Sequence, residues 1–237
     1  MIDERDLSQE KRWFYEQYAK TVINNIKKKN MNAQYVSSRA EALATVLGMI
    51  PQGAIVARGD SVTIEQIGII PELRNRQQNK IIYPFERNAD GSSVYPDREQ
   101  RKRIEREAFS ADIFLVGTNA VTLDGKLVNI DGGGNRVAAM ICGPEKVIVV
   151  AGVNKIVKDV DEALKRIHNV AAPMNAMRHY LKHEGTQFGD LPCARTGICV
   201  NCNHDWRICR YTVIIEGATP LQKGRINVVL VGEELGI

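Results

Sequence analysis

The sequence has no apolar run long enough to cross a membrane, since a spanning helix needs about 18 to 20 apolar residues. Its N-terminal stretch, MIDERDLSQEKRW, is charged and polar, unlike a secretory signal. The excess of positive charge is small and dispersed, with 32 basic against 28 acidic residues. We therefore expect a cytoplasmic protein with no membrane span and no nucleic-acid partner.

Internal repeats, low-complexity tracts and nucleotide-binding fingerprints are also missing. Gly132, Gly133 and Gly134 are consecutive, which is not the G-x-G-x-x-G spacing, and no Walker lysine follows them. We therefore predict no nucleotide cofactor. The 237 residues are 44% apolar, 25% charged and 6% aromatic, which is typical of a globular protein. We expect a single domain over residues 1–237.

The hydrophobic pattern alternates between helix and strand along most of the chain. Residues 1–30 are expected to contain a long amphipathic helix. The further predicted elements are strands at 31–36, 54–57, 81–83, 112–116 and 147–151, and helices from the serines at 37 and 38 to residue 49, at 97–109 and at 159–170. This order is typical of an α/β fold with a mostly parallel, Rossmann-like sheet and helices on both faces. Ligands of such sheets bind beyond the carboxyl ends of the strands.

Residues 171–210 break this pattern. Pro, Gly, His and four of the five cysteines accumulate there, and we predict an irregular, Cys-containing excursion. Two β-rich runs at 211–215 and 226–231 are expected to return the chain to the sheet. The fifth cysteine, Cys142, follows an apolar run in a predicted helix and is expected in the core.

Polar residues follow the predicted strand at 112–116. Gly117, Thr118 and Asn119 come directly after it, which places them at the edge of the sheet where ligands bind. A turn at Asp124-Gly125 then predicts a hairpin that leads back toward the same edge. Thr118 and Asn119 are therefore candidates to bind a hydroxyl or a carboxylate.

A glycine loop at residues 131–135 follows this hairpin and comes directly before a predicted helix start at Arg136. Unpaired backbone N–H groups and the helix dipole both favour an anion at such a junction. A second loop, after the strand at 54–57, could add another helix N-terminus to the same crevice. The predicted ligand-binding residues are Gly59, Ser61, Thr63, Gly117, Thr118, Asn119, Asn129, Asp131, Gly132, Gly133, Gly134, Asn135, Arg136 and Lys155.

Three carboxylates are candidates for a general base, namely Asp124, Asp131 and Glu65. Two of them also have a structural role to consider. Asp124 next to Gly125 is what a turn requires, and Asp131 could hydrogen-bond its own glycine loop. The catalytic residue, if there is one, is therefore left open among the three.

On these residues the chain resembles the LUD domain proteins associated with lactate utilization. The matching pattern is G-T-N-A-V-T-x-D-G-x-L-V-N-I-D-G-x-G-N-R-V at 117–137, with further matches at 59–68, 149–157, 171–176 and 193–199. The resemblance implies the fold group of ribose-phosphate isomerase, glucosamine-phosphate deaminase and coenzyme A transferases. Arg58 and Asp60 depart from the S-x-G-G-S that is common in the family at this loop. We expect them to change the polarity of the ligand that this loop accepts.

Four cysteines, Cys193, Cys199, Cys202 and Cys209, follow the spacing C-x5-C-x2-C-x6-C. Four thiolates favour zinc or an iron–sulfur cluster, and the two-residue spacing is common among thiolate ligands. The outer spacings match neither the usual zinc ribbon nor the ferredoxin run. Free thiols and redox-linked disulfides are therefore alternatives.

Two functions are consistent with these features. In the first, the protein binds, and could convert, a small anionic metabolite such as an organic acid, a sugar phosphate or a coenzyme A ester, in the lactate-linked metabolism that the resemblance implies. In the second, it is a non-catalytic accessory subunit that carries a metal or an iron–sulfur cluster and partners other lactate-utilization proteins. A homo-oligomer is compatible with either function.

Overall fold

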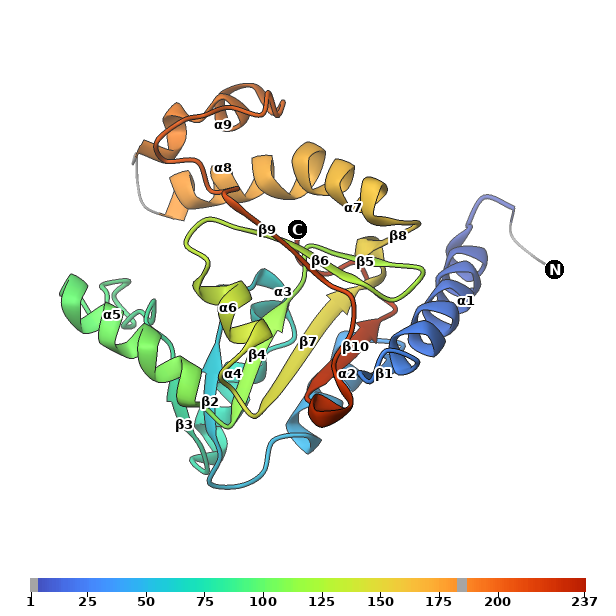
Figure 1. The fold of residues 1–237 in the computed structure, drawn as a ribbon, viewed down its shortest axis with the longest axis horizontal. Helices are drawn as coiled ribbons and strands as arrows, with labels where there is room; N and C mark the ends of the chain where they lie inside the picture. Colours follow the sequence, from blue (N-terminus) through green and yellow to red (C-terminus); the bar gives the residue numbers. More distant parts are fainter. Residues whose placement is uncertain (1–3, 183–186) are drawn as a thin grey trace.

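The computed structural model describes residues 4–182 and 187–237. Its centre is a six-stranded sheet in the order β1-β10-β7-β4-β2-β3, and every neighbouring pair is parallel (Figure 1). The strands are β1 (Asn32–Val36), β2 (Ile55–Arg58), β3 (Lys80–Ile82), β4 (Ile113–Gly117), β7 (Lys146–Gly152) and β10 (Ile226–Val231). The predicted parallel α/β sheet is confirmed.

Helices cover both faces of this sheet because its strands are apolar on both sides. In β7, Val147 and Val149 face one core, whereas Ile148 and Val150 face the other. The helices against the first core are α1 (Ser8–Lys27) and α6 (Asn135–Ile141), and those against the second are α2 (Arg39–Gly48), α3 (Val62–Gln66) and α4 (Ile69–Arg76). The charged helix α5 (Arg98–Glu107) buries no residue fully.

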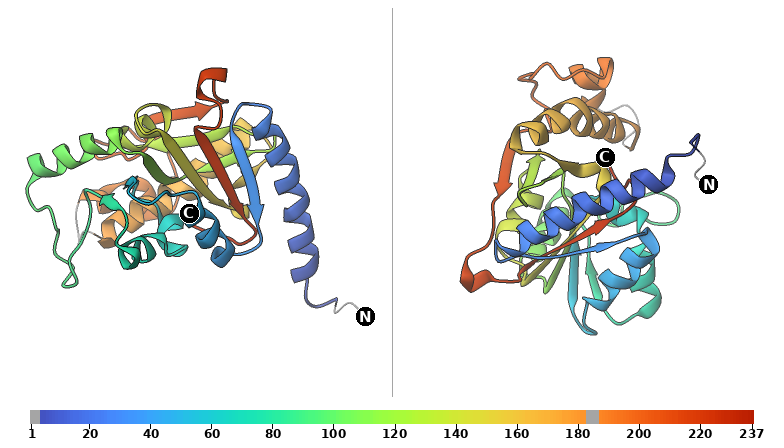
Figure 2. Two further views of the ribbon diagram at one scale, coloured as in Figure 1. Left: turned by 90° about the horizontal axis from the view of Figure 1, so that it is seen from below. Right: turned by 90° about the vertical axis from the view of Figure 1, so that its right-hand side faces the viewer.

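Helix α1 is amphipathic as predicted, but it packs along only part of its length. Ala19, Val22 and Ile26 are buried, whereas Trp13 is 68% exposed and Phe14 is 52% exposed. The N-terminal end of the helix extends beyond the sheet (Figure 2). In the described residues, no helix is both long and apolar enough to span a bilayer.

A second, four-stranded sheet in the order β8-β5-β6-β9 lies beside the first. Its strands are β5 (Ala120–Thr122), β6 (Leu127–Asp131), β8 (Ile156–Val157) and β9 (Tyr211–Ile215). The predicted hairpin between β5 and β6 is confirmed, and Gly125 adopts a positive φ of 85° in its turn. The predicted return of residues 211–215 to the main sheet is wrong, because β9 pairs antiparallel with β6. Of the two β-rich runs, β10 alone joins the central sheet.

The prediction of an irregular excursion from residue 171 is wrong for its first part. Helix α7 (Val160–Arg166) continues through a π-helical turn, η3 (Ile167–Ala171), into helix α8 (Ala172–Lys182) (Figure 1). Pro173, which favours the end of a helix, is instead the second residue of α8, just after this widened turn, where its missing N–H and its ring are tolerated. The remaining elements are η1 (Ala108–Ser110), η2 (Val153–Lys155), η4 (Gln187–Asp190), α9 (Pro192–Thr196) and η5 (Pro220–Gln222).

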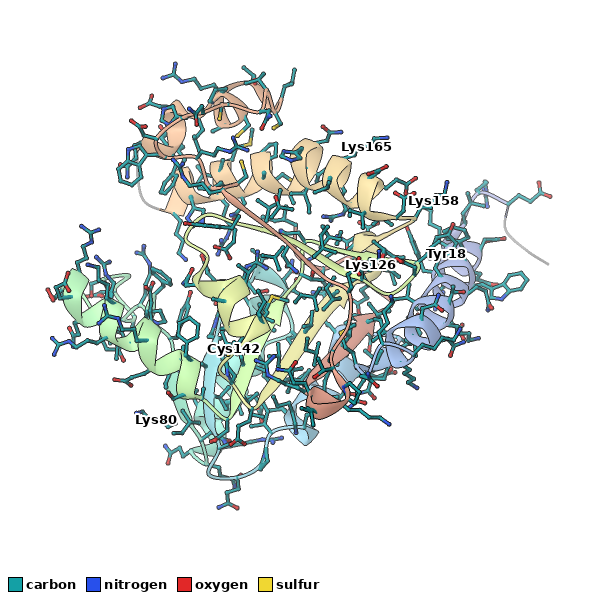
Figure 3. The ribbon with its side chains drawn as sticks, viewed as in Figure 1. Tyr18, Lys80, Lys126, Cys142, Lys158 and Lys165 are labelled. Carbon is teal, nitrogen blue, oxygen red and sulfur yellow. The ribbon has the colours of Figure 1, made fainter. Side chains whose placement is uncertain are left out.

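Cys142 is a further correction. It lies at the C-terminal cap of α6, where the chain turns extended, and it is exposed rather than part of the core (Figure 3). Helix α6 ends one residue earlier than the apolar run suggests, and Met140 is the residue that occupies the core.

Candidate functional site

A cavity of about 590 Å³ lies at the carboxyl edge of the central sheet. We call the lining residues at and after the ends of β2, β4, β6 and β7 the strand-end wall, namely 58–63, 117–119, 130–133, Asn135, Arg136 and Lys155. The opposite side, here called the outer wall, consists of lining residues from α8 and from 205–210. A parallel sheet brings its strand ends to one edge, which is why loops distant in sequence meet here.

Most of the predicted ligand-binding residues line this cavity. Asn129 and Gly134 are the two that do not, although Asn129 contacts residues that do. The lining residues from the predicted set are Gly59, Ser61, Thr63, Gly117, Thr118, Asn119, Asp131, Gly132, Gly133, Asn135, Arg136 and Lys155.

Arg136 connects the strand ends to the glycine loop. Its Nε donates to Asp131 Oδ2 at 3.1 Å, and Nη1 donates to Asn129 Oδ1 at 2.7 Å. Nη2 donates to Ile130 O at 2.8 Å and to Asn119 Oδ1 at 3.2 Å. A contact of 3.5 Å from Nη1 to the carbonyl of Gly117 is the longest of the set. Since a guanidinium has five N–H donors, Arg136 is fully engaged by the protein itself.

Asp131 hydrogen-bonds its own glycine loop, which is one of the two roles that the sequence left open for it. Its Oδ1 accepts the backbone N–H of Gly133 at 3.0 Å and that of Gly134 at 2.8 Å. Two of the loop donors considered for an anion are therefore satisfied by this carboxylate. Gly132 also approaches Ile208 closely, because an added Cβ would lie 3.2 Å from the Ile208 Cα. The loop thus packs directly against the outer wall.

The other two carboxylate candidates lie outside the cavity lining. Glu65 pairs with Arg58 Nη1 at 2.5 Å, and its side chain is 52% exposed. Asp124 lies in the hairpin turn, where it accepts a hydrogen bond from Thr122 and is 55% exposed. The structure therefore does not bring the three candidates together, and Asp131 alone reaches the cavity.

Lys155 is the most unusual titratable group of the strand-end wall. Its side chain is buried, with Nζ 3.0 Å from Thr63 Oγ1. Within the described residues, no carboxylate forms an ion pair with it. Burial, together with the nearby charges of Arg166 and Arg136, lowers the pKa of Lys155 to about 7.

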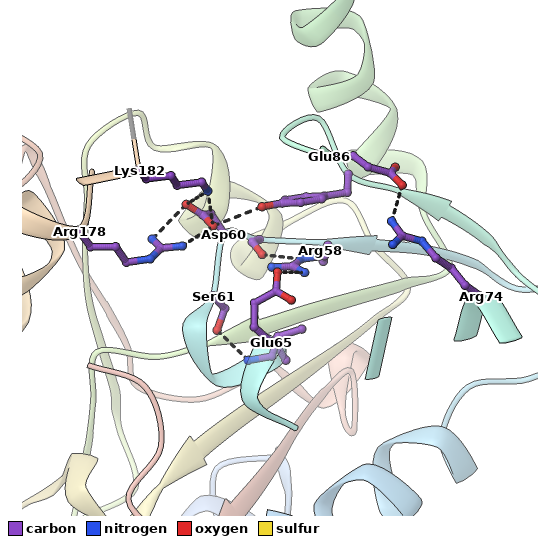
Figure 4. A network of polar contacts seen from close by, with 11 residues as sticks. Arg58, Asp60, Ser61, Glu65, Arg74, Glu86, Arg178 and Lys182 are labelled. Atoms are coloured by element: carbon purple, nitrogen blue, oxygen red, sulfur yellow. Dashed lines mark hydrogen bonds and ion pairs between the residues drawn. The ribbon is translucent and has the colours of Figure 1, made fainter. Parts of the chain in front are cut away.

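A network around Asp60 joins the two walls (Figure 4). Arg178 donates to both oxygens of Asp60, at 2.8 and 3.1 Å, and Lys182 Nζ lies 3.3 Å from each. Tyr83 donates its hydroxyl to the same carboxylate at 3.3 Å. Burial opposes ionisation, but Arg178 and Lys182 outweigh it and hold the pKa of Asp60 well below its usual range. Asp60 thus fastens α8 to the loop after β2.

Arg58, beside this network, retains an unused donor. Its Nε donates to Gly59 O and its Nη1 to Glu65, while its guanidinium lies 4.1 Å from the centre of the Tyr83 ring. The Nη2 atom is buried and finds no hydrogen-bond partner among the described residues. A buried unsatisfied donor is costly, so this atom favours an acceptor supplied by a ligand.

The lining residues from α8 are those that sequence reasoning missed. Asn175, Arg178, His179 and Lys182 follow the spacing i, i+3, i+4, i+7, which places them on one face of a helix. That spacing is the signal for them in the sequence. Pro173 and the neighbouring irregular residues conceal the helix, so the spacing does not by itself predict one.

Charge of one sign dominates the cavity. Among the residues that the structure describes, seven cationic side chains and four carboxylates line it. The cations are Arg58, Arg136, Lys155, Arg178, Lys182, Arg207 and Arg210, and the carboxylates are Asp60, Glu105, Asp131 and Asp205. A cavity with this balance attracts anions.

The four clustered cysteines line one small pocket between the start of α8, α9 and residues 199–209. Cys199 Sγ lies 3.4 Å from His168 Nδ1, and Arg207 Nε lies 3.2 Å from Cys209 Sγ. Burial and the other three thiols raise the pKa of Cys193. No group of three or more His, Cys, Asp or Glu side chains in residues 4–182 and 187–237 has the arrangement of a metal site.

Comparisons with known proteins give one family. The model of the LUD domain matches residues 19–231. A protein of the DUF162 family from Deinococcus radiodurans is similar in structure, with 14% identity and a TM-score of 0.50 over 92% of this chain and 97% of that chain. No curated protein matches the sequence.

Two further solved structures show weaker similarity. An acyl-CoA transferase from Escherichia coli O157:H7 has 15% identity and a TM-score of 0.38, over 55% of this chain and 33% of that chain. The delta subunit of eIF2B from Chaetomium thermophilum has 18% identity and a TM-score of 0.32, over 53% of this chain and 51% of that chain.

Proposed function

Because the chain belongs to the LUD domain family, we propose that its cavity binds a small anionic metabolite of lactate-utilization-type metabolism. The observation that carries this proposal is the lining of seven cationic side chains against four carboxylates in the described part of the chain. The buried, unpartnered Nη2 of Arg58 adds a donor that a ligand oxygen would satisfy. A volume of about 590 Å³ suits an organic acid or a sugar phosphate.

Isothermal titration calorimetry tests this proposal with lactate, pyruvate, ribose 5-phosphate and acetyl-CoA as probes. We expect saturable binding of at least one probe, with an affinity that falls as salt is added. Arg58→Gln removes the unpartnered donor and should weaken binding by roughly tenfold, the size of one hydrogen bond to a charged group. The matched control is Arg39→Gln, since Arg39 pairs with Glu233 at 2.7 Å outside the cavity lining. Heats no larger than those of dilution for all four probes would overturn the proposal.

A second candidate function rests on the cysteine pocket. The four thiols line one pocket, although no three of them have the arrangement of a metal site in the described residues. Arg207, whose Nε also donates to the Cys209 carbonyl at 2.8 Å, brings a positive charge to them. Thiolates that share a pocket with a cation can hold zinc or an iron–sulfur cluster, which would make the protein a metal-bearing accessory subunit. Anaerobic purification followed by metal analysis and a visible spectrum tests this. A band that bleaches with dithionite supports a cluster, a colourless zinc-containing sample supports zinc, and a metal-free sample contradicts the candidate.

A further inference from the structure

The strand-end wall contains a lysine whose surroundings are unlike those of a surface ammonium. Lys155 follows β7 directly, lines the cavity and is 4% exposed. Its neighbours with charge are guanidinium groups, Arg136 and Arg166, rather than carboxylates. A buried amine among cations is held in its neutral form more easily than an exposed one.

The immediate contacts of the amine are small and polar. Thr63 Oγ1 lies 3.0 Å from Nζ and is the hydrogen-bond partner of the amine. Gly236 packs against both groups, because an added Cβ would lie 2.8 Å from Nζ and 2.3 Å from Thr63 Oγ1. An added Cβ at Gly117 would likewise lie 2.7 Å from Ser61 Oγ and 3.6 Å from Thr63 Oγ1. Two hydroxyls and the amine therefore share a compact corner of the cavity.

These observations give the amine three properties that a carbonyl-binding lysine needs. The lone pair is available near neutral pH, since burial and the two guanidiniums lower the pKa of Lys155 to about 7. Lys155 lines a cavity rather than lying in packed core. The same cavity supplies cations for a carboxylate, including the unpartnered Nη2 of Arg58.

We propose that Lys155 captures a small 2-oxo carboxylate in this cavity by forming an imine with its keto carbon. The proposal rests on the anion-binding function proposed above and names its substrate class. The amine nitrogen attacks the keto carbon, and the C=O double bond opens to a hydroxyl. That hydroxyl has gained one hydrogen of the amine and leaves as water with the second, and a C=N bond replaces C=O, so no oxidant or reductant is required. Thr63, within hydrogen-bond distance of Nζ, positions the amine.

Reductive trapping tests the proposal on the full chain. The protein is incubated with pyruvate and sodium cyanoborohydride at pH 7, and its peptides are analysed by mass spectrometry. We expect one reduced pyruvate on Lys155, formed at least about 100-fold faster than on an exposed lysine, because little of an ordinary lysine is neutral at this pH. The trapping rate should rise with pH and level off just above 7. Lys158→Arg is the matched control, since Lys158 is exposed outside the cavity lining (Figure 3).

Lys155→Arg should abolish the adduct while circular dichroism shows a folded protein. If that variant fails to fold, the position of the adduct and the pH profile of the wild type still show whether Lys155 forms the imine. Calorimetric binding of pyruvate without an adduct on Lys155 would overturn the imine and leave the anion-binding function intact. Adducts spread equally over Lys155 and Lys158 would also overturn it. If pyruvate, glyoxylate and 2-oxoglutarate all fail to bind and form no adduct, the inference is overturned. The calorimetry with lactate, ribose 5-phosphate and acetyl-CoA then decides the anion-binding function separately.

Discussion

The two walls of the cavity differ in how their polar groups are used. In the strand-end wall, Arg136 and the glycine loop satisfy one another, and the side chains are largely buried. In the outer wall, Arg178 and Lys182 are each 23% exposed, and both depend on one carboxylate, that of Asp60. The first wall is a fixed framework, whereas the second is fastened by ion pairs that an anionic ligand can compete for. Substitutions in each wall test this difference.

The largest effect is expected for Arg136→Ala in the strand-end wall. The substitution leaves Asp131, which is 8% exposed, without its cation and removes the donors to Asn119 and Asn129. Breaking one side of a buried ion pair costs about 3–5 kcal/mol of unfolding free energy. Urea unfolding measures it. Arg39→Ala, which breaks an exposed pair with Glu233, is the control and should cost about 1 kcal/mol or less. Equal costs for the two variants would contradict a rigid strand-end wall.

Lys155→Met is expected to stabilise the protein by about 3 kcal/mol at pH 7. The fall of the Lys155 pKa to about 7 corresponds to about 4 kcal/mol of penalty on folding, and the lost hydrogen bond to Thr63 offsets about 1 kcal/mol of that gain. Between pH 7 and about 10, the unfolded wild type holds a proton that the folded protein lacks, so wild-type stability rises with pH. The difference between variant and wild type should therefore shrink over this window. Urea unfolding at several pH values measures it, and a difference independent of pH would show that Lys155 titrates normally.

Asp60→Asn removes the carboxylate that holds Arg178 and Lys182 of the outer wall. It should lower the unfolding free energy by about 1–2 kcal/mol at pH 7, a value reduced for the partial exposure of the pair. The pKa of Asp60 is depressed in the folded protein, so its contribution is complete above the unfolded value near 4 and is lost as pH falls further. Stability curves of variant and wild type should converge below about pH 4.

The same variant has a functional consequence. Without the carboxylate, Arg178 and Lys182 are released toward the cavity, and an anion should bind several-fold more tightly by calorimetry. Weaker binding would mean that Asp60 orients these cations for the ligand rather than competing with it.

The smallest effect is expected for Asp124→Asn, at a position that belongs to neither wall. Its side chain is 55% exposed in the hairpin turn and lies outside the cavity lining. The unfolding free energy should change by no more than about 0.5 kcal/mol. Anion affinity should stay within twofold of the wild type, and a larger loss would return Asp124 to the list of candidate catalytic groups.

Sequence reasoning found the strand-end wall because its pattern is local. An apolar strand that ends in Gly117, Thr118 and Asn119 is visible in a few consecutive residues, and parallel pairing then fixes which edge they occupy. It could not find the contribution of α8 in the same way. Arg178 reaches Asp60 across 118 positions of sequence, and the π-helical turn before Pro173 is selected by packing rather than by local propensity.

By itself, the sequence determined the parallel sheet, the hairpin and the polar residues at the strand ends, because apolar periodicity and turn residues act over a few positions. Only the tertiary structure decided which of those polar groups remain available. The donors of Gly133 and Gly134 are satisfied by Asp131, and Arg136 is occupied by five acceptors. Lys155, by contrast, is buried without a carboxylate partner in the described chain. Burial and the position of distant charges set its chemistry, and neither can be read from neighbouring residues.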